Sequence, residues 1–194
     1  AQGTGKSYFA KVLEWVLGSN AKSLDPSALG ERFTGWAHGS VVNIVEEIRI
    51  KGDDKWRIMD RLKPFITNSM IQIEEKGRDH RTVPNFTNYL LLTNYKDALP
   101  ITNDDRRFCV MYGRIQNEQE LFDFFGGREQ TADYFENLFA ESEKHAGVIK
   151  GFLLNYKISD EFKASGRAPD TSSRQAMIQA TISPEQCSVE DLIN

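Results

Sequence analysis

Gly3-Thr4-Gly5-Lys6-Ser7, close to the start of the sequence, is the stretch that decides which fold the chain predicts. It matches the end of a phosphate-binding loop, whose pattern is G-x-x-x-x-G-K followed by Ser or Thr. In such a loop the glycines let backbone N–H groups turn inward around a phosphate, and the lysine neutralises the phosphate charge. We therefore expect Gly3, Thr4, Gly5, Lys6 and Ser7 to bind a nucleotide, with the Ser7 hydroxyl also binding Mg²⁺.

A helix is predicted directly after this loop. Apolar residues recur at helical spacing between Lys6 and Leu17, and Gly18 suits the helix end. The first glycine of the pattern would precede Ala1, and so would the strand that normally leads into the loop. Either the sequence is a fragment of a longer protein, or the nucleotide-binding function of the loop has been lost. A third reading is an ordinary loop before a helix.

Two predicted strands end in polar residues that suit the same chemistry. The β-branched run Val41–Val45 is followed by Glu46 and Glu47, and the run Asn88–Thr93 is followed by Asn94. An apolar strand ending in acids is typical of a Walker B motif, in which one carboxylate holds Mg²⁺ and a second, adjacent carboxylate can polarise the attacking water. Asn94 could orient that water. The alternatives are a solvated turn for the glutamates and a turn-initiating asparagine.

An arginine pair, Arg106-Arg107, precedes a further predicted strand at Phe108–Tyr112. An arginine here could stabilise charge on the γ-phosphate of a neighbouring subunit, as arginine fingers do. The alternative is a loop in which Asp104 and Asp105 pair with the two arginines. Spacing alone leaves both readings open, and does not choose between Arg106 and Arg107.

A basic hairpin is predicted where two strands join, at Glu75–Arg81. Gly77 suits the turn, and the first of the two strands alternates through Ile71 and Ile73. Four side chains crowd positive charge at its tip: Lys76, Arg78, His80 and Arg81. This charge suits contact with a nucleic-acid backbone, although a hairpin tip is more often only solvated.

Composition limits the classes of protein that fit. The chain has 194 residues, of which 40% are hydrophobic, and a net charge of −4. These values exclude a histone-like basic protein and a highly charged disordered chain. Residues 1–114 hold 17 Lys and Arg against 14 Asp and Glu, whereas residues 115–194 hold 7 against 14. No apolar run approaches the ~20 residues of a membrane span, so we expect no membrane partner.

The two cysteines, Cys109 and Cys187, form neither a metal cluster nor a disulfide framework. Reduced thiols and a cytoplasmic location are the expected reading.

The second half of the chain is predicted to be helical. Four helical patterns follow Gly113, at Glu118–Phe125, Ala132–Glu143, Val148–Tyr156 and Ser173–Thr181. The front half also contains a helical pattern at Trp56–Ile66. Strands interleaved with helices predict an α/β protein with a three-layer core. We expect that core to span residues 1–114 and a helical C-terminal layer to span residues 115–194.

In order and spacing these motifs resemble the ATPase domain of superfamily-3 helicases, most closely the helicase half of phage and plasmid primase–helicases. The segments that carry the resemblance are Gly3–Ser7, Val45–Glu47, Leu62–Thr67, Ile73–Gly77, Tyr89–Asn94 and Asp105–Phe108. The likeness covers residues 1–114 well and the tail more loosely.

The resemblance implies a P-loop NTPase core of the AAA+ type, truncated at its first strand, in a DNA replication protein. It further implies ATP and Mg²⁺ as cofactors, a homo-oligomeric ring, usually a hexamer, around single-stranded DNA, and hydrolysis at subunit interfaces. Glu47, Asn94 and one of Arg106 and Arg107 would be catalytic, Ser7 and Glu46 would hold the metal, and the hairpin would touch DNA. The expected setting is the cytoplasm of a bacterial or phage-infected cell.

Two other functions remain open from the sequence. One is a truncated, catalytically inactive remnant that still binds nucleic acid, which the missing first glycine favours. The other is a different P-loop enzyme such as a small-molecule kinase, which the basic hairpin and the arginine pair disfavour.

Overall fold

The computed structural model describes residues 4–50, 55–162 and 166–181, and Gly3 and Cys187 therefore lie outside the described residues. The described α-helices are α1 (Lys6–Leu17), α2 (Lys55–Thr67), α3 (Glu118–Phe125), α4 (Arg128–Lys144), α5 (Ala146–Asn155) and α6 (Ser172–Thr181). The strands are β1 (Ala21–Leu24), β2 (Val42–Val45), β3 (Met70–Ile73), β4 (Arg81–Pro84) and β5 (Asn88–Leu91). Short 3₁₀ helices lie at Gly18–Asn20, Pro26–Leu29 and Gly35–Ala37.

The central sheet is parallel, with strand order β1-β2-β5. Val45 at the end of β2 lies opposite Leu24 of β1 and Leu91 of β5, so the three strands end at the same edge. Strands β3 and β4 form a separate antiparallel hairpin, in which Ile71 pairs with Val83. The two runs that lead into the predicted site residues are therefore confirmed as strands, and the structure shows that they are neighbours in one sheet.

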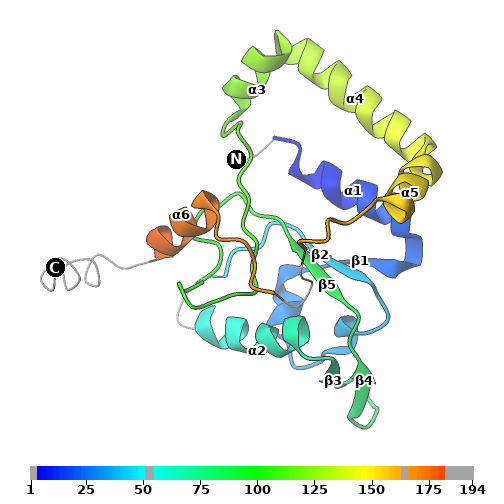
Figure 1. The fold of residues 1–194 in the computed structure, drawn as a ribbon, viewed down its shortest axis with the longest axis vertical. Helices are drawn as coiled ribbons and strands as arrows, with labels where there is room; N and C mark the ends of the chain where they lie inside the picture. The colour runs from blue at the N-terminus through cyan, green and yellow to red at the C-terminus, as the bar shows by residue number, and fades with distance from the viewer. Residues whose placement is uncertain (1–3, 51–54, 163–165, 182–194) are drawn as a thin grey trace, which may run out of the picture.

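Helix α2 covers one face of this sheet, and α1 lies on the opposite side (Figure 1). Val45 belongs to one buried cluster with Met59 and Leu62 of α2, and the partly buried Leu91 packs against this cluster. Ile44, whose side chain points to the other face of β2, is fully buried outside that cluster. Strand β2 thus buries apolar side chains on both of its faces, as expected for the central strand of a parallel sheet between helices.

One polar side chain interrupts the apolar interior of β2. Asn43 is fully buried; its amide donates to the Trp36 carbonyl at 3.1 Å, and its oxygen accepts from the Ser40 hydroxyl at 2.7 Å. Close by, the Thr87 hydroxyl lies 2.8 Å from the carbonyl of Ser40. These bonds satisfy the amide, so its burial costs little. They also tie the loop before β2 to the start of β5.

Helices α3, α4 and α5 form an arch that leaves the core and returns to it on α1 (Figure 1). Local sequence explains the start of the arch: the Asn117 side chain caps α3 by accepting from the Glu120 N–H at 2.9 Å. Gly126, in a left-handed conformation with φ 87°, ends the same helix. The arch rests on α1 through aromatic side chains, with Phe139 packed edge-on against Tyr8 and Trp15. The helices predicted in this half are confirmed.

The prediction of a strand at Phe108–Tyr112 was wrong. Backbone groups of this segment bond to the side chains of the α6 region instead of to a neighbouring strand. The Tyr112 N–H donates to the Ser173 hydroxyl at 3.0 Å, and the Val110 carbonyl accepts from the Thr171 hydroxyl. Conversely, β1 was not predicted, because Ala-Lys-Ser-Leu has neither alternation nor β-branched residues.

Candidate functional site

The loop residues Gly5, Lys6 and Ser7 lie where α1 begins. Gly5 caps the helix in a left-handed conformation with φ 81° and ψ 10°, which glycine adopts without steric cost. The Lys6 ammonium donates to the Thr4 hydroxyl at 3.3 Å, and partial burial lowers the pKa of Lys6. Backbone N–H groups at a helix start carry partial positive charge, so this end of α1 suits an anion.

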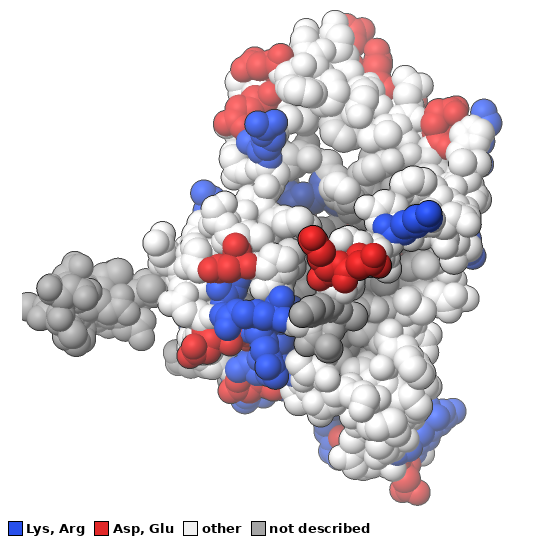
Figure 2. Space-filling model, in the orientation of Figure 1, with Lys and Arg blue, Asp and Glu red and all other residues white. Residues whose placement is uncertain are grey.

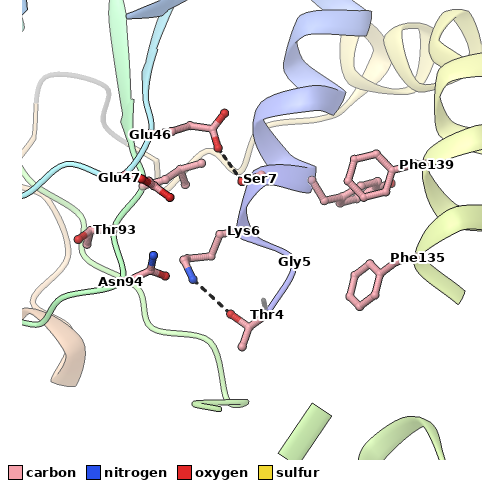
Figure 3. A pocket seen from close by; sticks show the side chains of 12 residues that line it. Thr4, Gly5, Lys6, Ser7, Glu46, Glu47, Thr93, Asn94, Phe135 and Phe139 are labelled. Carbon is pink, nitrogen blue, oxygen red and sulfur yellow. Dashed lines mark hydrogen bonds between the residues drawn. The ribbon is translucent and has the colours of Figure 1, made fainter. Parts of the chain in front are cut away.

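A cavity of about 270 Å³ opens beside this loop. Its lining comes from the loop, from the ends of β2 and β5, and from α4: Thr4, Gly5, Lys6, Ser7, Tyr8, Glu46, Glu47, Leu92, Thr93, Asn94, Phe135 and Phe139. Figure 3 shows Glu46, Glu47 and Asn94 on the side that faces Lys6. Seven predicted site residues that are separated by up to 90 positions in sequence thus line one cavity.

Ser7 and Glu46 are in direct contact. The Ser7 hydroxyl donates to Glu46 Oε2 at 2.6 Å, which joins the start of α1 to the end of β2 (Figure 3). A hydroxyl and a carboxylate at this separation are two hard oxygen ligands, the kind that Mg²⁺ prefers. The two side chains that the sequence analysis expects to hold a metal thus lie in direct contact.

Glu47 has an unusual backbone. Its φ of 55° is the only left-handed conformation of a non-glycine residue among the described residues. The chain turns sharply here, because the Ile48 N–H returns to the Leu92 carbonyl of the neighbouring segment at 3.0 Å. The turn leaves Glu47 exposed and directs its side chain to the cavity. Conformations of this kind cost free energy and gather at functional sites.

The amide oxygen of Asn94 is buried and has no hydrogen-bond partner in the part of the chain that the structure describes. It follows β5 by three positions and lies at the cavity wall across from Lys6 (Figure 3). A buried carbonyl oxygen without a partner costs roughly 1–3 kcal/mol. A bound water or ligand donor at this position would recover that free energy.

Two aromatic residues of the cavity were missed by sequence reasoning. Phe135 and Phe139 are one helical turn apart on α4, far from the motifs in sequence. A Cβ at Gly5 would lie 2.9 Å from the Phe135 ring, so the ring packs directly on the loop backbone. The only available signal was their spacing of four residues, which is equally typical of any buried helix face.

The arginine pair does not line the cavity. Arg106 is exposed, whereas the Arg107 guanidinium lies 3.5 Å from the buried Asp105 carboxylate. The Arg107 N–H also donates to that carboxylate, at 2.9 Å. Of the two interpretations left open by the sequence, the salt-bridged loop therefore applies to Arg107 and not to Arg106.

The β3–β4 hairpin carries the predicted basic tip, with Gly77 in a left-handed turn at φ 74°. The carboxylates of Glu74 and Glu75 on the same hairpin neutralise much of that positive charge. Glu75 pairs with Arg78 at 3.2 Å and with Arg81 at 3.0 Å, and His80 lies 3.7 Å from Glu74.

Lys76 is exposed and has no carboxylate within ion-pair distance in the described ranges. Figure 2 shows mixed charges at the hairpin and mainly acidic side chains over the helical arch. None of the described helices combines the length and the apolar character that crossing a membrane requires.

Comparison with known proteins finds similarity to a phage protein. The DNA primase-polymerase of Nitratiruptor phage NrS-1 is 22% identical over 157 residues, which are 79% of this chain and 21% of the relative. The chain thus spans about a fifth of that relative's length.

Solved structures of the NrS-1 C-terminal region share the fold. One apo structure matches with a TM-score of 0.76 at 18% identity, over 99% of this chain and 44% of that chain. An A-form apo structure matches with a TM-score of 0.66 at 17% identity, over 94% of this chain and 40% of that chain. Residues 1–107 match DUF5906, described as a family of unknown function. The match covers more than half of the sequence, and the chain therefore belongs to the DUF5906 family.

Proposed function

We propose that this chain is the ATP-hydrolysing motor domain of a phage or plasmid replication protein, with a P-loop NTPase fold and a helicase or translocase role on DNA. The observation that carries the proposal is the cavity in which Lys6 and Ser7 face Glu46, Glu47 and Asn94. A helix start, a lysine and two carboxylates around one space are the parts that phosphoryl transfer needs. The similarity to a phage DNA primase-polymerase supports the setting in DNA replication.

The residues present fit a magnesium ion. Ser7 Oγ and Glu46 Oε2, 2.6 Å apart, provide a hydroxyl and a carboxylate at the base of the cavity. These two side chains would hold the ion, which supplies neutralisation of charge on the phosphate oxygens when it is bound. Lys6 adds a second positive charge from the start of α1.

Glu47 and Asn94 have complementary roles in this proposal. The exposed Glu47 carboxylate accepts a proton from the attacking water, as a general base does. The Asn94 oxygen, which has no partner among the described residues, accepts a hydrogen bond from the same water and aligns it. The strained backbone of Glu47 keeps its carboxylate at the cavity.

Arg106 is the residue that we assign to the neighbouring subunit's site. Lys6 is the only Lys or Arg that lines the cavity in the described part of the chain, while two carboxylates line it as well. A nucleoside triphosphate needs further positive charge during hydrolysis, and a second copy of the chain in a ring can supply it. Arg106 suits that role because its side chain is exposed, whereas Arg107 is paired with Asp105.

The hairpin is the proposed contact with single-stranded DNA. The Lys76 ammonium can bind a DNA phosphate directly. Exposed ion pairs such as that of Arg78 with Glu75 contribute little to stability, so Arg78 can exchange its carboxylate for a phosphate. Several copies of a weak contact around one strand add up when the copies are linked in an oligomer.

The nucleotide site is tested by ATP hydrolysis in the full-length protein that carries this chain. Lys6→Ala should remove about 2–4 kcal/mol of transition-state stabilisation, and turnover should fall by the corresponding factor. Glu47→Gln should retain ATP binding and lose most turnover, because the amide cannot take the proton. Lys11→Ala is the matched control, since Lys11 lies on the same helix but pairs with Glu14. Unchanged turnover in Lys6→Ala would refute the proposed function.

The DNA contact is tested by the salt dependence of binding. Lys76→Ala combined with Arg78→Ala should weaken binding of single-stranded DNA and lower the salt slope by about 0.7 for each lost phosphate contact. Basal ATP hydrolysis should persist, because the hairpin does not line the nucleotide cavity. Lys144→Ala with Lys150→Ala, both exposed on the arch, is the matched control. An unchanged slope in the hairpin variant would assign the DNA contact to another surface.

A further inference from the structure

The loop that carries Arg106 is bound from one side by a buried arginine of α6. Arg174 is 2% exposed. Its Nη2 shares its two hydrogens among three backbone carbonyls of the loop, those of Thr102 at 2.8 Å, Asn103 at 2.9 Å and Asp105 at 2.7 Å.

The other terminal nitrogen of the same guanidinium is also engaged. Arg174 Nη1 pairs with Asp170 at 3.0 Å, so the side chain cannot rotate away from the loop without losing an ion pair. A planar guanidinium with five donors can serve several acceptors at once, which a lysine ammonium does less well. Burial strengthens these charge-assisted bonds and makes their loss costly.

The segment before α6 adds two more contacts to the same loop. The Arg167 guanidinium donates to the Asn103 carbonyl, and the Ala168 N–H donates to the carbonyl of Arg106 itself at 2.8 Å. On the inner side of the loop, the buried Asp105 carboxylate binds the Arg107 N–H. The backbone on both sides of Arg106 is therefore fixed, while its side chain remains exposed.

We propose that Arg174 is a positioning residue that holds the 102–107 loop so that Arg106 is presented to a neighbouring subunit. The proposal rests on the function proposed above and adds a role for α6, which lies outside the part of the chain that matches the family. A catalytic group must be kept within a fraction of an ångström of its productive position, because displacement by about 1 Å costs up to 100-fold in rate. Six carbonyl or carboxylate contacts around one loop supply that constraint.

The alternative is that Arg174 only attaches α6 to the core. Met177 and Ile178 of the same helix are buried in the main apolar cluster, so α6 also has a purely structural attachment. The two roles differ in what the loss of Arg174 does when Arg106 is already absent. If Arg174 positions Arg106, its loss has no further effect on activity once Arg106 is absent. If Arg174 is structural, its loss still lowers activity in that background.

The test is a double-mutant cycle on ATP turnover in the full-length, assembled protein. Arg106→Ala should lower kcat at least as much as Arg174→Gln, for which we expect a fall of about 10- to 100-fold. The KM for ATP should change little, since Arg106 acts on charge that develops in the transition state and Arg174 acts only through Arg106. The double variant should be no slower than Arg106→Ala alone. Arg174→Lys should not restore the rate, because one ammonium cannot replace the fork.

Met177→Ala is the matched control, because it loosens α6 without touching the loop carbonyls. It should lower the melting temperature and leave kcat near the parent value below the transition. An equal fall in kcat for Met177→Ala, or a further fall in the double variant, would reduce Arg174 to a structural role. If Arg174→Gln does not fold, Arg167→Ala takes its place in the cycle, since Arg167 is exposed and donates to the same Asn103 carbonyl.

The outcomes also separate this inference from the proposed function. Loss of turnover in Lys6→Ala together with full turnover in Arg106→Ala would overturn the inference and leave the nucleotide site intact. Full turnover in Lys6→Ala would overturn both.

Discussion

The core and the helical arch are stabilised in different ways. Sixteen buried apolar residues form one cluster that spans the sheet, α2, the loops after β5 and α6. The arch has far fewer: the only buried residues of α3 and α4 are Leu121, Thr131 and Ser142, and α5 has none. Several large apolar side chains of α5 remain exposed, such as that of Leu154, which is 78% exposed. The arch therefore depends on a few contacts with α1.

The region that stabilises the fold is therefore not the only region that lines the cavity. Most cavity residues belong to the core half, but Phe135 and Phe139 come from the weakly packed arch. A wall that is bound by few buried contacts opens at lower free energy than the core does. We expect movement of the arch to change the cavity without unfolding the sheet.

The largest expected effect is on the core side of this comparison. Leu62→Ala removes a side chain that is 2% exposed and should lower the free energy of unfolding by about 2–5 kcal/mol. Leu154→Ala, on the arch, should change it by less than about 0.5 kcal/mol. Urea denaturation of both variants measures the two values. Similar losses would mean that the arch is buried in the protein as it exists in solution.

A smaller effect is expected at the contact between the two regions. Phe139→Leu keeps an apolar side chain but loses the edge-on contacts with Tyr8 and Trp15, which lie at centroid distances of 5.4 and 6.0 Å. The cost should be about 1–3 kcal/mol, since each such pair contributes about 0.5–1.5 kcal/mol. Limited proteolysis should then cut the arch sooner than the core. Phe152→Leu, at an exposed position, is the control. Equal cleavage rates in both variants would contradict the importance of this contact.

The smallest effect is expected at Glu47, a strained position within the well-packed half. Glu47→Gly removes the cost of a left-handed conformation at a non-glycine residue, which is about 1–2 kcal/mol. It also raises the conformational entropy of the unfolded chain, which lowers stability by about 0.5–1 kcal/mol. The net result should be a gain of about 0.5 kcal/mol in stability, with loss of ATP turnover. Glu46→Gly should lower stability, because Glu46 has no left-handed backbone to relieve. Thermal unfolding of the pair tests this, and a lower melting temperature for Glu47→Gly would contradict the strain.

Much of the site was predictable because its residues lie in local patterns. The loop before α1 and the acids after β2 each follow an element whose periodicity is visible in sequence. Parallel strands then bring their ends to one edge, so Glu46 and Asn94 line the same cavity although 48 positions separate them. The helix Glu118–Phe125 was predicted to the residue, since Asn117 and Gly126 mark both ends.

The rest depended on contacts between distant segments. The apolar run at Phe108–Tyr112 has strand propensity, but hydroxyls from Thr171 and Ser173 take its backbone groups. Similarly, nothing near Arg174 in sequence indicates that it binds carbonyls some 70 positions away. Such tertiary bonds override local preference and leave no periodic signal.

The buried Asn43 also limits how the sheet can assemble. The three central strands are each four residues long, so few backbone bonds distinguish one alignment from the next. A slip of β2 by one residue would turn Asn43 to the opposite face and away from Ser40 and the Trp36 carbonyl. The amide would then be buried without partners, at a cost of roughly 1–3 kcal/mol. One asparagine in the middle of an apolar strand thus disfavours a one-residue slip, and so helps to keep the two acids after β2 at the same edge of the sheet as the asparagine after β5.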